Sequence, residues 1–149
     1  MFIITFNFIY TLALIPSKAE KIVDAILSSN DKMLLVSIRG WSGNLIAVKS
    51  RDSFKERFFG VSRLIGTRYS GSLTIATLSL VNEAKDVFGE AQAIITLYKD
   101  CKVMLLPMPS HQILIGLAIE RSSDTVKEEE REEGYDIASK IERLVADTL

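Results

Sequence analysis

Three apolar runs, rich in β-branched residues, follow one another closely in the second half of this chain, at residues 91–98, 101–107 and 112–119. Lys99-Asp100 joins the first two runs and a short Pro-containing turn joins the last two. Connections this short favour antiparallel pairing of neighbouring strands. The last run, QILIGLAI, is apolar at almost every position, which is typical of a central strand covered on both faces. The fold must therefore place other elements on both sides of a sheet.

A second pair of strands is predicted in the first half of the chain. The runs 33–38 and 45–48 flank Gly40-Trp41-Ser42-Gly43-Asn44, a stretch that has the composition of a hairpin turn. No helix is expected directly after this glycine pair, so it does not form a phosphate-binding loop. We interpret the hairpin as part of the sheet rather than as a site of chemistry.

Amphipathic patterns predict helices at both ends of the chain. Ser17 and Glu20 form a predicted capping box before an apolar stripe with helical spacing. Thr125 and Glu128 open a predicted C-terminal helix whose charged first turns, including the glutamates at 128–133, are expected to lie in solvent until the helix docks after Gly134. The stripe residues are Ala19, Ile22, Val23, Ile26 and Leu27 in the first helix, and Ile137, Ile141, Leu144 and Val145 in the last.

The segment between Ser72 and Gly89 predicts a helix with unusually much apolar surface. Ser72 can cap it and Gly89 can end it, and apolar residues occupy most of the helical wheel between them. A sheet covers only one face of such a helix, so another partner must cover the rest. A second copy of the chain is the simplest candidate. The preceding residues, 51–70, are predicted as a short helix or an ordered loop.

The order of elements predicts an α+β fold, in which five antiparallel strands carry helices on both faces. One domain is expected over residues 17–149, preceded by an apolar N-terminal extension at 1–16. Three interpretations of its first fifteen residues stay open: an extra strand or flap, a membrane or signal segment, and an overlong gene start. The run is shorter than a bilayer span and lacks the basic start of a signal peptide.

The sequence contains no recognisable motif for nucleotide binding, zinc binding or nucleophilic catalysis. Neither glycine-rich nucleotide-binding pattern occurs. One cysteine, Cys101, and one histidine, His111, cannot build a zinc site without several carboxylates. A Cys101–His111 nucleophile–base pair is a minor hypothesis beside a strand cysteine and a solvated loop histidine. These observations leave no recognisable catalytic motif and no expected cofactor or metal, and the single cysteine fits a reducing, cytoplasmic setting.

Charge is distributed unevenly along the chain, although the net charge is only −1. Basic residues predominate from 49 to 68 and acidic residues from 120 to the end. Two solvated faces of opposite sign are the plainer interpretation, and steering of a charged protein partner is the alternative. Nucleic acid is not an expected partner. The candidate partner face comprises Trp41, Arg51, Lys55 and Arg57.

The sequence resembles the roadblock/dynein light-chain superfamily, and in particular the roadblock-like small proteins of archaea, over residues 17–149. The family's hairpin pattern G-x-x-G-x-x-I-A reads Gly40-Trp41-Ser42-Gly43-Asn44-Leu45-Ile46-Ala47 here. The stretch from VFGEAQ to MLLP, residues 87–107, is similar to the family's third and fourth strands and the residues before them. Residues 51–70 depart from the compact family pattern, and the first fifteen residues have no counterpart in it.

The resemblance implies a non-enzymatic homodimer, or a heterodimer with a related roadblock-like chain, that binds other proteins such as a small GTPase. The residues that it assigns to the dimer interface are Leu73, Ala76, Leu80 and Ala84 on the central helix and Ile94 and Thr96 on the third strand. Two alternatives stay open. One is a ligand-sensing domain, for which Gln92 and Thr96 are the few polar candidates at inward positions, and the other is an adaptor recruited to membranes through the N-terminal run.

Overall fold

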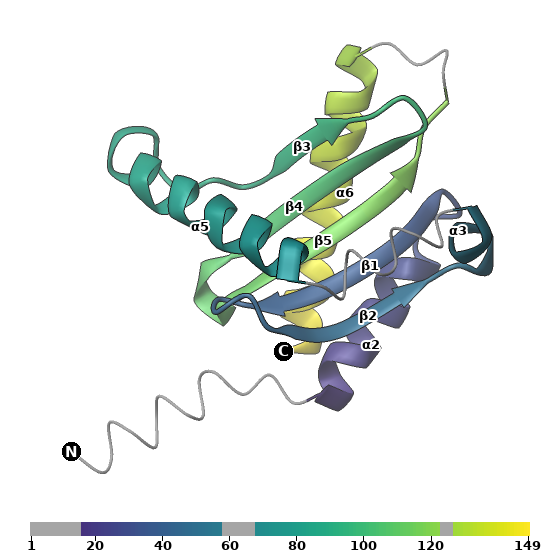
Figure 1. Ribbon diagram of the computed structural model, residues 1–149, viewed down its shortest axis with the longest axis horizontal. Coiled ribbons are helices and arrows are strands. Elements are labelled where there is room, and N and C mark those ends of the chain that lie inside the picture. Colours follow the sequence, from purple (N-terminus) through teal and green to yellow (C-terminus); the bar gives the residue numbers. More distant parts are fainter. Residues whose placement is uncertain (1–15, 58–67, 123–126) are drawn as a thin grey trace.

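The computed structural model describes residues 16–57, 68–122 and 127–149, with the side chains of these residues except those of 55–57 and 68–74. In chain order the elements are α2 (Pro16–Ser28), β1 (Met33–Gly40), β2 (Leu45–Ser50), α3 (Asp52–Arg57), α5 (Arg68–Phe88), β3 (Ile94–Leu97), β4 (Cys101–Met108), the 3-10 turn η1 (Pro109–His111), β5 (Ile113–Glu120) and α6 (Lys127–Thr148). The predicted order of helices and strands is confirmed (Figure 1).

The five strands form one antiparallel sheet in the order β2-β1-β5-β4-β3. β5 lies at the centre and pairs with β1 and β4, which agrees with its continuously apolar sequence. β2 and β3 are the two edge strands. The predicted α+β fold with a five-stranded antiparallel sheet is therefore confirmed.

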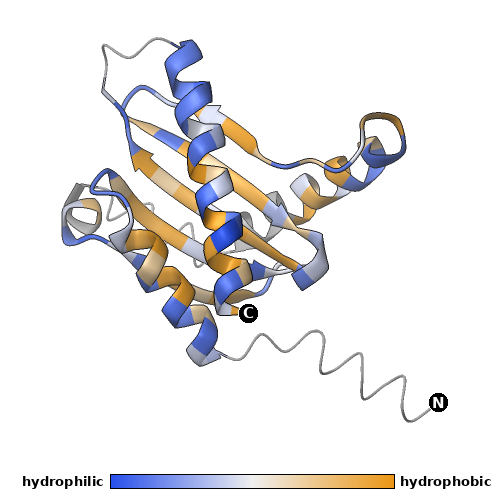
Figure 2. Cartoon of the chain, turned by 180° about the vertical axis from the view of Figure 1, so that it is seen from behind, coloured by the Kyte–Doolittle hydropathy of each residue, from blue (hydrophilic) through white to orange (hydrophobic). Residues whose placement is uncertain are grey.

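Helices α2 and α6 cover one face of the sheet side by side (Figures 1 and 2). The predicted apolar stripes of both helices face the strands, and alternate residues of β1, β4 and β5 complete this core. Its side chains include Ile22 and Ile26 from α2, Ile137 and Ile141 from α6, and Ile115 at the centre of β5. Burial of these side chains stabilises the domain by roughly 1.5–3 kcal/mol each.

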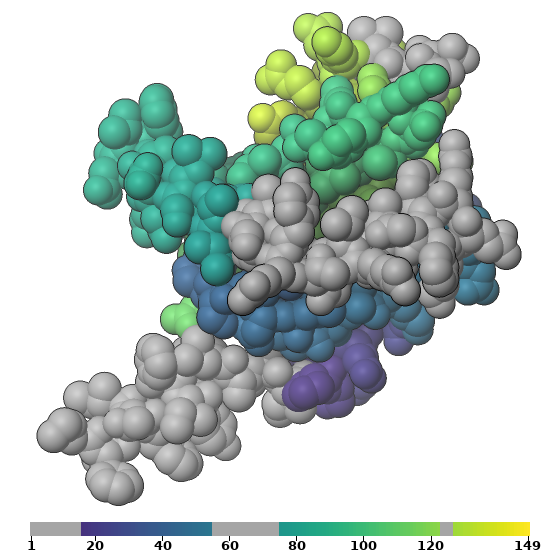
Figure 3. All heavy atoms as spheres, viewed as in Figure 1, coloured from purple at the N-terminus to yellow at the C-terminus, as the bar shows by residue number. Residues whose placement is uncertain are grey.

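Helix α5 lies on the other side of the sheet, and its C-terminal half projects from the body of the molecule (Figures 1 and 3). Within the described part of the chain, α5 makes only sparse contacts with the strands. A smaller core on this side joins Phe54 of α3 to Leu34, Leu35 and Ala118 of the sheet. Helices therefore occupy both faces, as predicted, but α5 is far less enclosed than α2 or α6.

Several predicted boundaries differ from the structure. Ser72 lies inside α5, which begins at Arg68, and Ser17 lies inside α2, which begins at Pro16, so neither serine caps its helix. Proline is favoured at the first helical position because its missing N–H has no intrahelical partner there. β3 spans only Ile94–Leu97 of the predicted run 91–98. In the segment 51–70, α3 is the predicted short helix, whereas residues 58–67, the predicted helix start at Thr125 and residues 1–15 lie outside the described residues.

Hydrogen bonds fix the turn of the β1–β2 hairpin. Gly43 adopts a φ of 87°, a left-handed conformation that glycine tolerates best. Nη1 of the buried Arg39 donates a hydrogen bond of 2.9 Å to the Gly43 carbonyl, and the backbone N–H of Trp41 donates one of 3.0 Å to the Gln112 carbonyl. The hairpin tip is thereby tied to the turn before β5, as expected of a structural element.

Candidate interaction surface

Helix α5 exposes an apolar stripe to solvent, which we call the α5 stripe. It comprises Ala76, Leu80 and Val87, with the half-buried Ala84 between them. Leu80 is 64% exposed and Val87 75% exposed, and the neighbouring Phe88 reaches 85%. The spacing 76, 80, 84, 87 keeps these residues on one side of a helix, in the pattern used for helix–helix packing. Thr77, Leu78 and Val81, on the adjacent side of α5, are buried.

The edge strand β3 presents its outward residues on the same side of the sheet as α5. Ile95 lies on the α6 side, where it approaches Gly134. Because side chains alternate along a strand, Ile94 and Thr96 point to the opposite side, where α5 lies. Ile94 is half-buried, and Thr96 and the adjacent Tyr98 are exposed. Of the six predicted interface residues, only Leu73 has a side chain outside the described part, and their interface role stays a prediction.

The four residues of the predicted partner face have different environments in the structure. Trp41 is half-buried at the hairpin tip. Arg51 donates hydrogen bonds to three backbone carbonyls, from Nε to Met33 at 2.6 Å and from Nη2 to Leu27 at 2.8 Å and to Asn30 at 3.1 Å. Its guanidinium thus joins the end of α2 to the start of β1. The side chains of Lys55 and Arg57 lie outside the described part, so a partner face here stays a prediction.

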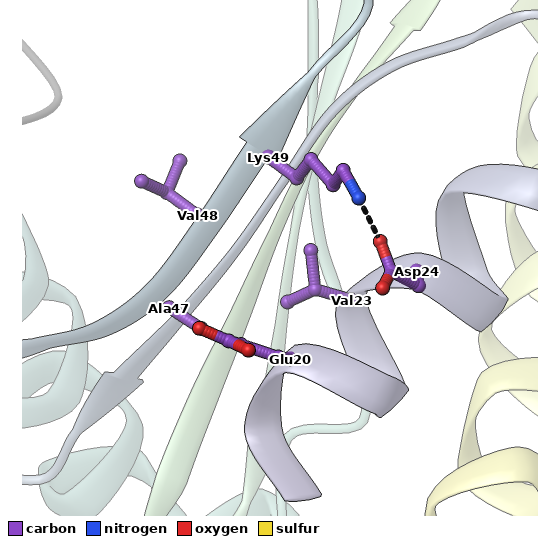
Figure 4. Close-up of a pocket in the computed structure, with 6 residues that line it drawn as sticks. All are labelled: Glu20, Val23, Asp24, Ala47, Val48 and Lys49. Carbon is purple, nitrogen blue, oxygen red and sulfur yellow. Dashed lines mark hydrogen bonds and ion pairs between the residues drawn. The ribbon is translucent and has the colours of Figure 1, made fainter. Parts of the chain in front are cut away.

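A groove of about 320 Å³ lies between α2 and the edge strand β2, and we call it the α2–β2 groove (Figure 4). Val23 and Ala47 form its apolar floor, while Lys49 reaches across from β2 and donates a hydrogen bond to Asp24 of α2. Glu20, one helical turn before Asp24, also lines the groove. Within the described residues, no ion pair engages Glu20.

A buried group of charges, which we call the Lys102 cluster, joins the sheet to α6. Nζ of Lys102 on β4 lies 2.6 Å from Oε2 of Glu130 and 3.4 Å from Oε2 of Glu133, both on α6. Nε of Arg121 lies 3.3 Å from the other oxygen of Glu130. The prediction that the first turns of α6 lie wholly in solvent is therefore wrong for Glu130, whose side chain is 3% exposed because it pairs with a buried lysine.

The Lys102 cluster favours the ionised form of Glu130. Burial by itself raises the pKa of this carboxyl group. The hydrogen bond and positive charge of Lys102, together with the charge of Arg121, lower the pKa by more than burial raises it. The net result is a pKa below the usual value for glutamate. The cluster is therefore a set of ion-paired charges that joins α6 to the sheet, rather than a poised acid or base.

Cys101 and His111, considered from the sequence only as a minor hypothesis for a nucleophile–base pair, are separated by the length of β4. Cys101 begins β4 and His111 lies in the turn beyond the other end of that strand, whose first and last residues lie roughly 23 Å apart at the usual rise per residue. Gln92 and Thr96, the polar candidates for a ligand pocket, are both exposed.

The described residues contain neither a metal-ligating cluster nor a membrane-spanning helix. In residues 16–57, 68–122 and 127–149, no group of three His, Cys, Asp or Glu side chains is placed to hold a metal ion. In the same ranges, no helix is long and apolar enough to cross a lipid bilayer.

Comparison of the sequence with family models and with curated proteins gives no match. Comparison of the fold does. The chain is similar to MglB of Myxococcus xanthus, with a TM-score of 0.58, 10% identity and coverage of 92% of this chain and 94% of that one. It is also similar to a roadblock/LC7 domain from Streptomyces avermitilis, with a TM-score of 0.53, 9% identity and coverage of 85% and 90%. An MglB described as having a tetrameric arrangement gives a TM-score of 0.53 at 11% identity, with 93% and 96% covered. The chain has the roadblock fold.

Proposed function

We propose that this chain is a non-enzymatic scaffold that pairs with a second copy of itself through the α5 stripe and β3, and that the pair binds and regulates a small GTPase. The observation that carries the proposal is the α5 stripe. Leu80 and Val87 leave well over half of their side-chain surface in water. Covering each of them on association contributes on the order of 1–2 kcal/mol.

A twofold pairing suits the distribution of side chains on α5. A symmetric dimer places the same surface of both copies face to face, so an apolar stripe meets an apolar stripe. The small Ala76 and half-buried Ala84 alternate with the larger Leu80 and Val87, which lets two helices approach closely. β3 is an edge strand whose Ile94 and Thr96 face the α5 side, and within the described residues no strand pairs with its outer edge, so its backbone groups there can pair with a second β3.

The GTPase as partner rests on the fold. Proteins with a roadblock fold resemble one another in serving as dimeric platforms, many of them for small GTPases, and the similar structures include MglB proteins and a roadblock/LC7 domain. Since one fold can host several functions, the partner needs its own test.

Sedimentation velocity of the full chain tests the pairing. We expect a dimer at tens of micromolar, and we expect Leu80→Glu and Val87→Glu to give monomers because each places a charge in an apolar contact. Tyr135→Glu is the matched control, because Tyr135 is similarly exposed at 53% but lies on α6, on the opposite side of the sheet. A monomeric full chain, or a Tyr135→Glu variant that dissociates as readily, contradicts the proposed interface.

Binding of a small GTPase from the same organism tests the regulatory role. The GTPase is loaded with GDP or with a non-hydrolysable GTP analogue and titrated with the full chain by calorimetry. We expect binding to one nucleotide state and a change in the GTP hydrolysis rate on addition of the full chain. If neither nucleotide state binds and the hydrolysis rate does not change, a GTPase partner is contradicted. That result would not affect the proposed dimer.

A further inference from the structure

The outer edge of β2 pairs with no other strand of the described residues. β2 is the edge strand opposite β3, and within the described residues no strand pairs with it on the side away from β1. Every second backbone N–H and C=O group of Leu45–Ser50 therefore points away from the sheet. Natural edges are usually blocked by proline, by very short strands or by inward-pointing charges. β2 has six residues, and its one lysine, Lys49, is turned toward Asp24 of α2 (Figure 4).

The two faces of β2 differ in chemistry beside this edge. Ala47 belongs to the core on the α2 side, and the next residue, Val48, therefore faces the other way. Leu45 lies on the same face as Val48, because their partners on β1, Arg39 and Ser37, are two residues apart. Both aliphatic side chains are exposed. A strand added at this edge can cover them with apolar side chains on that face.

On the other face, the edge of β2 borders the α2–β2 groove. Its floor is apolar at Val23 and Ala47, and its rim carries the carboxylates of Glu20 and Asp24. Lys49 neutralises Asp24, whereas Glu20 has no ion pair within the described residues. A long basic side chain fits these features, because its methylene stem can lie on the floor while its charged end reaches Glu20.

We propose that the β2 edge and the α2–β2 groove together bind an extended segment of a partner protein, in which aliphatic residues alternate with lysine or arginine. The segment adds a sixth strand to the sheet beside β2. Its main chain pairs with the free groups of β2, its aliphatic side chains cover Leu45 and Val48, and its basic side chains enter the groove toward Glu20. Addition of a strand at a sheet edge, with side-chain pockets for specificity, is an established mode of peptide recognition.

This site is independent of the proposed dimer. β2 and β3 are the opposite edges of the sheet, and the α5 stripe lies on the other side of the sheet from α2 (Figures 1 and 2). A pair formed through α5 and β3 leaves both β2 edges open. Failure of the peptide to bind therefore contradicts this inference alone.

The test uses the full chain and a blocked, fluorescein-labelled hexapeptide, (Val-Lys)3, measured by fluorescence anisotropy. We expect (Val-Lys)3 to bind and (Val-Glu)3 to bind at least tenfold more weakly. Glu20→Lys should weaken (Val-Lys)3 at least tenfold, because it reverses the charge at the groove rim. The matched control is Glu132→Lys, which changes an equally exposed glutamate in the acidic first turns of α6 and should leave the affinity within twofold. Equal loss in both variants overturns the proposal, since it indicates a general attraction to acidic surface.

The strand pairing itself has a separate readout. Only one set of alternate amides in (Val-Lys)3 faces β2, so of the two peptides N-methylated at one or the other set, the one methylated at the facing set should lose all measurable binding. Amide hydrogen exchange of Leu45–Ser50 in the full chain should slow at alternate residues on addition of (Val-Lys)3. If the amides of Leu45–Ser50 that point away from β1 are already protected without peptide, a second copy or another part of the same chain pairs with this edge. The partner-segment proposal is then wrong.

Discussion

The ammonium group of Lys102 and the carboxylate of Glu130 lie 2.6 Å apart, and both side chains are almost wholly buried, at 1% and 3% exposed. This pair joins the first residues of β4 to the first turn of α6. A second hydrogen bond runs from Lys102 to the Glu130 backbone carbonyl at 3.4 Å. The start of α6 is thus fixed by charge, while its later turns are fixed by apolar packing around Ile137 and Ile141.

Removal of the charge on Glu130 should destabilise the domain strongly. Glu130→Gln keeps the shape of the side chain but leaves Lys102 buried with only the more distant Glu133 carboxylate, and breaking a buried pair typically costs about 3 kcal/mol or more. The free energy of unfolding, measured by urea denaturation, is the readout. Glu132→Gln is the control, because Glu132 is exposed on the same turn, and its effect should stay within about 0.5 kcal/mol.

A paired replacement separates the cost of an orphaned charge from the value of the pair. Lys102→Met with Glu130→Leu removes both charges and keeps apolar volume, so it should be more stable than Glu130→Gln alone. If the double variant has a lower free energy of unfolding than Glu130→Gln, the attraction within the ion pair exceeds the cost of burying its two charges.

The same pair gives the stability a defined pH dependence. The folded-state pKa of Glu130 lies below its ordinary value of 4.5. The stability that its ionisation contributes is therefore complete above that value and is lost as the pH falls through the lower, folded-state pKa. Urea denaturation at a series of pH values from 6 down to 3 should show a steeper loss for the natural chain than for Glu130→Gln. Parallel curves for the two proteins contradict this assignment.

The Lys102 cluster also shows what the sequence could reveal and what it could not. The strands, helices and their order follow from periodicity, and so does the excess apolar surface of α5, seen at Leu80 and Val87. Lys102 occupies the same alternate register as the inward-facing Met104 and Leu106, and Glu130 lies seven residues before Ile137, on its side of the helix. That alternation is a signal for the buried pair, but it is weak because a lysine at a strand start is usually exposed.

Other features depend on tertiary contacts that no local pattern contains. Arg51 belongs to a basic stretch that predicted a partner face, yet its three hydrogen bonds go to carbonyls between Leu27 and Met33. The α2–β2 groove likewise depends on how α2 lies against β2. Neither can be derived from residue spacing, because both join segments some twenty residues apart.

Arg51 should therefore matter for stability before it matters for any partner. Arg51→Lys keeps the charge but cannot reach three carbonyls with one ammonium group, so we expect a loss of about 1–3 kcal/mol in the free energy of unfolding. Lys18→Met serves as a surface control, because it alters an exposed basic residue at the end of α2 away from Arg51. Thermal and urea denaturation of both variants measure the difference, and an unchanged Arg51→Lys protein contradicts a structural role.

Gly116 at the centre of β5 offers a test of how closely the central strands approach. Gly116 is paired with Ser37 on β1, and a Cβ atom added at Gly116 lies 2.6 Å from the Ser37 Oγ, closer than side chains tolerate. Gly116→Ala should lower the free energy of unfolding by about 1–3 kcal/mol, because the serine hydroxyl must move or the strands must separate. Ser37→Ala removes the obstructing oxygen, so the double variant Ser37→Ala with Gly116→Ala should recover most of that loss in a double-mutant cycle. Additive losses in the cycle contradict the Ser37 hydroxyl as the source of the strain, since the other neighbour of that position, the Leu105 Cδ2 at 3.7 Å, is at an ordinary contact distance.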